Sequence, residues 1–152
     1  MTVENHPCIS PQKNILVLSM KNTQTLIMAC CGAANVGQLS NQVALELVKE
    51  GYGSAFCLAG IGAHRRGFVR SATENETILI DGCAIGCCKL MLEQAEVPLK
   101  KYLVLTDLGI EKSVGAEIRP EDYENAGKAV LDLCNLPLPS LPPFKTTSSC
   151  CG

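Results

Sequence analysis

Four short apolar runs, separated by segments with helical spacing, dominate the hydrophobic pattern of this chain. None of the four alternates strictly between apolar and polar residues, which is typical of strands covered on both faces of a parallel sheet. We therefore expect strands at residues 26–30, 54–58, 78–81 and 103–107. A weaker apolar run at residues 15–18 is a candidate edge strand.

The segments between these runs repeat apolar residues every three to four positions, which is typical of amphipathic helices. The clearest helix is expected over residues 36–50, ending before Gly51, with one apolar face made of Val36, Leu39, Val43, Leu47 and Val48. We expect further helices at residues 64–72, at residues 84–95 with Leu90, Met91 and Ala95 turned inward, and from Pro120 to about Cys134. Alternating strands and helices predict an α/β fold: a single three-layer domain with a mainly parallel sheet of four to five strands and helices on both faces.

Changes in amino-acid composition divide the chain into three parts. Residues 1–24 form a polar leader with the possible edge strand, and residues 25–135 form the α/β domain. Residues 136–152 form a tail that holds four of the eight prolines and ends in the vicinal pair Cys150-Cys151. Such a composition is typical of an extended segment outside the core.

Composition narrows the class of protein. The chain has 152 residues, 47% hydrophobic and 18% charged, which is ample for a buried core. Its net charge of −2 gives no electrostatic basis for a nucleic-acid partner. The apolar runs are too short for a membrane span or a secretory signal, so we expect a cytoplasmic protein with reduced thiols. Ten cysteines exceed what packing needs, which indicates metal binding or redox chemistry.

Three of these cysteines, Cys30, Cys57 and Cys83, stand at or just after the ends of successive predicted strands. The carboxyl ends of parallel strands meet at one edge of a sheet, where ligands bind. Cys87 follows four residues after Cys83, so both project from one face of a helix that begins near Cys83. Four thiolates suit tetrahedral zinc. The sequence therefore predicts a zinc site made of Cys30, Cys57, Cys83 and Cys87.

Other residues near these positions leave alternatives open. Cys31 can substitute for Cys30, whereas Cys88 is expected to point away from Cys83 around the helix. We assign Cys8 and Cys134 to ordinary packing or surface positions, and His64 is a minor candidate at the start of a helix. Three basic residues can either offset the charge of a thiolate site or form ordinary surface: Arg65, Arg66 and Lys89.

Three sequence blocks resemble the DGC-type proteins, a family described as zinc-binding and named for the tripeptide seen here at residues 81–83. The blocks, in order, are CCGAANVGQLSNQVALELVKEGYGSAFCLAGIGA, ILIDGCAIGCCKLMLEQA and YLVLTDLGIEK. The resemblance covers residues 25–112 and implies that the motif cysteines are Cys30, Cys57, Cys83 and Cys87. This chain departs from the pattern by carrying a second cysteine at positions 31 and 88. The resemblance implies metal binding and names no reaction.

We therefore expect a zinc-binding protein that takes part in metal sensing, storage or transfer. The alternative is a redox protein that uses the same cysteines in thiol exchange or to hold an iron–sulfur cluster, with Cys150-Cys151 as a shuttle. A third interpretation is the binding of soft toxic metals or metalloids. The sequence shows no Ser-His-Asp set and no phosphate-binding fingerprint, so it predicts no catalytic residue or substrate. The partner that it predicts is a metal ion, with no membrane or nucleic acid, and it assigns no protein partner.

Overall fold

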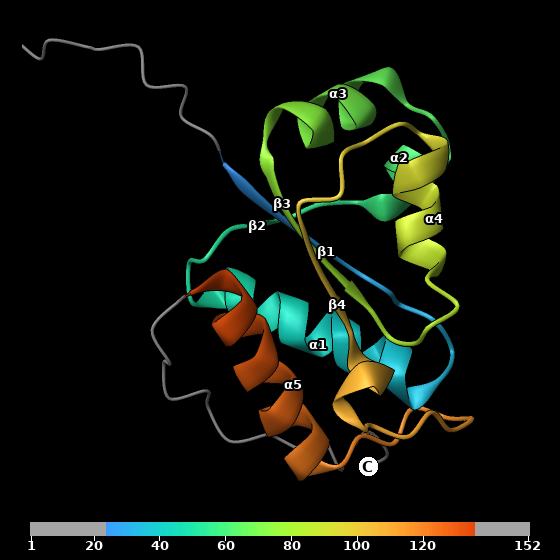
Figure 1. Ribbon diagram of the computed structural model, residues 1–152, viewed down its shortest axis with the longest axis vertical. Helices are drawn as coiled ribbons and strands as arrows, with labels where there is room; N and C mark the ends of the chain where they lie inside the picture. Colours follow the sequence, from blue (N-terminus) through green and yellow to red (C-terminus); the bar gives the residue numbers. More distant parts are fainter. Residues whose placement is uncertain (1–23, 136–152) are drawn as a thin grey trace, which may run out of the picture.

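The computed structural model describes residues 24–135 of the chain (Figure 1). Its sheet has four parallel strands in the order β2-β1-β3-β4. These strands are β1 (Thr25–Ala29), β2 (Ser54–Ala55), β3 (Glu76–Asp81) and β4 (Lys101–Val104). All four strands run in the same direction, so their carboxyl ends lie along one edge, as the sequence predicted.

Helices cover both faces of the sheet (Figure 1). On one face lie α1 (Asn35–Lys49) and α5 (Pro120–Cys134), and on the other lie α2 (Leu58–Gly62), α3 (Arg66–Glu74) and α4 (Cys87–Gln94). A short 3-10 helix, η1 (Leu105–Leu108), follows β4. The predicted three-layer α/β domain is confirmed.

Each face of the sheet has its own buried apolar cluster. Val36, Leu39, Val43 and Leu47 of α1 are almost fully buried against the sheet and α5, as their spacing predicted. The second cluster joins the sheet to the helices of the opposite face through Ile61, Leu79 and Leu92, among others. Burying each large side chain contributes about 1.5–3 kcal/mol, so apolar packing supplies the main force that holds both layers in place.

Several predicted boundaries were wrong. β2 is only two residues long, because the predicted strand residues 56–58 lead into the unpredicted α2, which begins at Leu58. The ring of Phe56 packs on that of Phe68 with centroids 5.4 Å apart. Residues 105–107 belong to η1 and not to a strand. Leu90 is 47% exposed, because the buried side of α4 and the turn that ends it carries Cys88, Leu92 and Ala95.

Two predicted segments lie outside the described residues. They are the leader, with its candidate strand at residues 15–18 and Cys8, and the tail with Cys150-Cys151. Between residues 24 and 135, no helix has both the length and the apolar character that a membrane span requires.

Candidate thiol and metal site

Two cysteine sulfurs and one carboxylate meet at the carboxyl edge of the sheet. Cys30 directly follows β1, Asp81 is the last residue of β3, and Cys88 is the second residue of α4. One ligand atom from each of these side chains lies within 4.8 Å of the other two. In the described part of the chain, no other group of three Cys, His, Asp or Glu side chains comes this close together.

Asp81 fixes the start of α4 beside the end of β3. Its carboxylate is buried and accepts hydrogen bonds from the backbone N–H groups of Cys88 at 3.1 Å and Lys89 at 3.0 Å. These donors belong to the first turn of α4 and have no acceptor within the helix, so Asp81 serves as its cap from a distance in sequence. The hydroxyl of Tyr102 donates a third hydrogen bond at 3.1 Å. Burial, together with this carboxylate, raises the pKa of Tyr102.

Hydrogen-bond donors surround the sulfur of Cys30. The S–H of Cys88 donates to it, and so do the backbone N–H groups of Gly32, at 3.4 Å, and Gly82. The Cys88 hydrogen bond, helped by these N–H groups, lowers the pKa of Cys30 to about 6, against the opposing effects of burial and Asp81. The same hydrogen bond, with burial and Asp81, raises the pKa of Cys88. The two pKa values are thus shifted in opposite directions, which favours the thiolate at Cys30 and the thiol at Cys88.

Glycines allow the loops of this edge to pack closely. A Cβ atom on Gly82 would lie 2.8 Å from the backbone carbonyl of Val36, in the first turn of α1. A Cβ on Gly37 would lie 2.8 Å from the backbone of Gly32, in the loop that follows Cys30. Both positions require glycine, and together they hold the Cys30 loop and the Gly82 turn against the start of α1.

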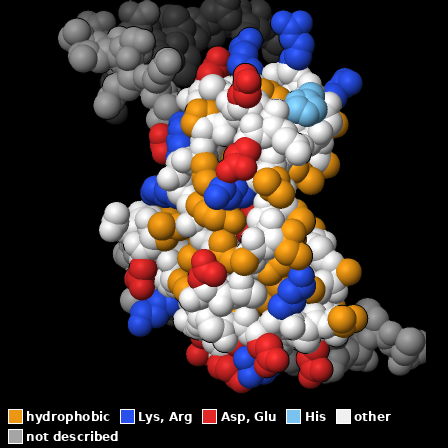
Figure 2. Space-filling model, turned by 45° about the vertical axis from the view of Figure 1, so that its right-hand side comes forward, with side chains coloured by type: hydrophobic (Ala, Val, Ile, Leu, Met, Phe, Trp, Pro, Cys, Tyr) orange, Lys and Arg blue, Asp and Glu red, His pale blue; other side chains and the backbone are white. Residues whose placement is uncertain are grey.

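A groove opens beside the thiol pair, between α1 on one side and α2 and α4 on the other. We call it the thiol groove, since five cysteines line it: Cys30, Cys31, Cys57, Cys87 and Cys88. Its volume is about 470 Å³, and the rest of its lining is mostly apolar. Figure 2 shows hydrophobic side chains gathered across the narrowed middle of the face that it draws. Cys31 donates to the side-chain oxygen of Asn41 at 3.4 Å, and burial raises its pKa.

Of the four predicted ligands, three line this groove and one does not. Cys30 lies within the close group, and Cys57 and Cys87 line the groove as exposed side chains. Cys83 packs against the α1 and α5 cluster, and the ammonium of Lys112 donates to its sulfur at 3.4 Å.

The expectation that Cys83 and Cys87 share the first turn of a helix was wrong. The turn after β3 ends at Gly86, whose φ of 65° is left-handed, and α4 begins only at Cys87. Because α4 starts later than expected, the side chain of Cys88 lies beside that of Cys30. The sequence had predicted that Cys88 points elsewhere.

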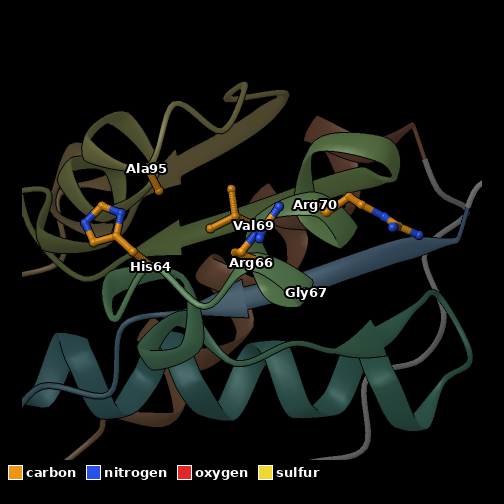
Figure 3. A pocket seen from close by; sticks show the side chains of 6 residues that line it. All are labelled: His64, Arg66, Gly67, Val69, Arg70 and Ala95. Carbon is orange, nitrogen blue, oxygen red and sulfur yellow. The ribbon is translucent and has the colours of Figure 1, made fainter.

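The side chains of the remaining candidates do not belong to the close group. Cys134 is buried in the α5 packing, as expected. His64 lines a separate surface hollow of about 580 Å³ with Arg66, Arg70 and Ala95 (Figure 3). Lys89 lies 5.8 Å from the centre of the Tyr102 ring, and its ammonium is 3.7 Å from Glu93.

The sequence interpretation did not select two residues of the close group: Asp81 was not considered as a site residue, and Cys88 was only an open alternative to its neighbour Cys87. A signal for Asp81 was present, because an acidic residue at the end of a strand, shortly before a helix with no capping side chain of its own, is a candidate cap. Cys88 had no such signal, since its direction depends on where α4 begins.

Comparison with known proteins places the chain in a family. The model of the DGC domain matches residues 26–130, so the chain belongs to the DGC domain family. A relative is the "Anaerobic and virulence modulator AnvM" of Pseudomonas aeruginosa. The two proteins are 36% identical over 100 residues, which cover 65% of this chain and 76% of the relative. No solved structure matches the chain.

Proposed function

We propose that this protein binds a zinc ion at the carboxyl edge of its sheet, with the thiolates of Cys30 and Cys88 as the first pair of ligands. The observation that carries the proposal is the close group of Cys30, Cys88 and Asp81. Zinc accepts sulfur and carboxylate ligands, and sulfur binds it as thiolate. The lowered pKa of Cys30 favours that form. Asp81 already accepts three hydrogen bonds, so we assign it the role of a positioning residue.

Two sets of cysteines compete as the complete group of zinc ligands. The set Cys30, Cys57, Cys83 and Cys87 stays a prediction, and we add the competing set in which Cys88 replaces Cys83. Cys88 lies beside Cys30, whereas Cys83 lies beside Lys112, and this difference favours the second set. Cys57 and Cys87 line the same groove as the pair, which supports them as the remaining two thiolates.

We further propose that the zinc is exchangeable, as metal sensing, storage or transfer in the cytoplasm requires. Each face of the sheet is already covered by an apolar cluster, so the fold does not depend on a bound metal ion. Cys57 and Cys87 are exposed, which gives a competing ligand access to the site.

The test is metal analysis of protein purified without oxygen. We expect about one zinc per chain in the wild type. Cys30→Ser and Cys88→Ser should lose most of the zinc, whereas Cys134→Ala, which changes a buried cysteine of the α5 packing, should keep it. If Cys88→Ser keeps its full zinc content and Cys83→Ser loses zinc, the ligand set that contains Cys83 is the correct one. Loss in Cys134→Ala equal to that in Cys30→Ser would reject the site. A brown protein that contains iron and inorganic sulfide would show that the site holds an iron–sulfur cluster and not zinc.

The contact between Cys30 and Cys88 favours thiol–disulfide exchange as a second candidate function. The Cys30 thiolate would attack a disulfide, forming a mixed disulfide and releasing one thiolate, which takes up a proton. The Cys88 thiol would then lose its proton and attack the Cys30 sulfur, releasing the second thiol. The two cysteines are oxidised and the disulfide is reduced by the same two electrons. Reduction of oxidised glutathione by metal-free protein, with a Cys30–Cys88 disulfide found by peptide mapping, would support this function, and its absence would reject it.

A further inference from the structure

The thiol groove has a lining that zinc binding does not use. Away from the cysteines it is built from apolar side chains, among them Leu45 and Val48 of α1, Phe56, Leu58 and Met91. All residues of its lining fall within the described part of the chain, and none of them has a charged side chain. Apart from the cysteines, Asn41 supplies the polar side chain of this lining. A volume of about 470 Å³ falls in the range of small-molecule sites, so the groove has room for an organic group beside the thiols.

The chemistry of the two ends restricts the ligand. A phosphate or carboxylate would find no cation in this lining. At the thiol end, the sulfurs of Cys30 and Cys88 lie close enough together to bind one soft centre. A ligand that fits both ends therefore carries a soft electrophilic atom and a single apolar substituent.

We propose that the thiol groove binds trivalent arsenic compounds that carry one apolar organic substituent. The dihydroxyarsine R–As(OH)₂ would react with the thiols of Cys30 and Cys88. The Cys30 thiolate and the Cys88 thiol would each displace one hydroxyl group, so that two As–O bonds break and two As–S bonds form. The Cys88 proton and one proton from solvent convert the two released hydroxides to water. Arsenic stays trivalent, so no oxidant or reductant is needed. The substituent R would lie along Leu45 and Met91, out of water.

This inference depends on the thiol pair and the groove, and not on the proposed zinc. If the protein contains no zinc, arsenic binding is still expected. If zinc is present, the arsenical should displace it, because both use the same two sulfurs.

Two probes that differ only in apolar size test the proposal: methyl and phenyl dihydroxyarsine, the hydrated forms of the two arsine oxides. Affinities for the reduced full chain are measured by competition with dithiothreitol, which has two thiols and no groove. We expect a one-to-one adduct that has lost two waters, mapped to Cys30 and Cys88 by mass spectrometry. The preference for phenyl over methyl should exceed that of dithiothreitol by about tenfold or more.

Matched variants separate the groove from the thiols. Leu45 of α1 lines the groove and Leu90 of α4 does not, although the two residues are similarly exposed, at 45% and 47%. Leu45→Glu should weaken phenyl binding by about tenfold and leave methyl binding unchanged, and Leu90→Glu should change neither. Cys88→Ala should abolish both. The inference is overturned if the phenyl preference equals that of dithiothreitol, if Leu45→Glu binds phenyl as the wild type does, or if the adduct maps to other cysteines.

Discussion

The side chain of Asp81 and the backbone N–H of Cys88 are joined by a hydrogen bond of 3.1 Å. Through this bond, the last residue of β3 holds the first turn of α4 in place, and the same turn supplies the thiol that donates to Cys30. The other two residues of the Asp81-Gly82-Cys83 tripeptide have different surroundings. Gly82 packs on the start of α1, and Cys83 lies beside Lys112. Asp81 therefore links the fold to the thiol pair.

Replacing Asp81 by Asn should destabilise the protein and loosen the pair. The amide would place an NH₂ group where the carboxylate now accepts hydrogen bonds, so a buried donor of α4 or Tyr102 would lose its acceptor. We expect the free energy of unfolding, measured with urea, to fall by about 1–3 kcal/mol. Asp107→Asn, which changes an exposed aspartate of η1, should stay within about 0.5 kcal/mol of the wild type. Equal effects of the two substitutions would contradict the capping role.

The reactivity of Cys30 should depend on pH with a midpoint of about 6 in metal-free protein, the pKa given by its surroundings. Thiolate is the nucleophile, so alkylation by iodoacetamide, followed peptide by peptide, should slow as the pH falls through this value. Because the pKa is lowered on folding, the thiolate also contributes stability that is complete above the unfolded pKa and lost as the pH falls toward about 6.

Variants of Cys88 test the cause of this shift. Cys88→Ala removes the S–H donor and should move the Cys30 midpoint upward, toward the ordinary value for cysteine, whereas Cys88→Ser keeps a donor and should move it less. Cys134, whose pKa burial raises, serves as the internal reference and should react slowly throughout this range. An unchanged midpoint in Cys88→Ala would show that the Cys88 hydrogen bond does not lower the pKa.

A methyl group at Gly82 should disturb the edge of the sheet. In Gly82→Ala the new Cβ would lie 2.8 Å from the backbone of Val36, which cannot move without shifting α1. We expect a loss of about 1–3 kcal/mol in the free energy of unfolding. Gly67→Ala, where a Cβ meets nothing within 4 Å on α3, should be neutral or slightly stabilising. A neutral result for Gly82→Ala would show that this loop adapts easily.

The sequence predicted the layers well because burial on both faces leaves a strong pattern. The apolar runs and the 3.6-residue spacing of α1 depend on local order along the chain, so Leu39, Val43 and Leu47 could be assigned to the core. The early end of β2 was not predicted, because the apolar run continues through residues 56–58, where Phe56 packs on Phe68, twelve residues further along the chain.

The site was harder to predict than the fold. Parallel topology alone indicated that cysteines would gather at one edge, and the shared groove of Cys30, Cys57 and Cys87 agrees with this. Which sulfurs touch depends on the starting residue of α4, and a shift of a few residues exchanges Cys83 for Cys88 as the neighbour of Cys30. The bond between the Asp81 carboxylate and the backbone of α4 holds that start in place, and it joins two residues that are seven positions apart in the chain.

The most direct test of the central claim, that Cys30 and Cys88 together bind zinc, is X-ray absorption at the zinc edge on protein purified without oxygen. We predict a shell of sulfur ligands at about 2.3 Å in the wild type. This shell should lose sulfur in Cys88→Ser and stay unchanged in Cys83→Ser. A shell made only of nitrogen and oxygen, or a sulfur shell that Cys88→Ser leaves intact, would contradict the account.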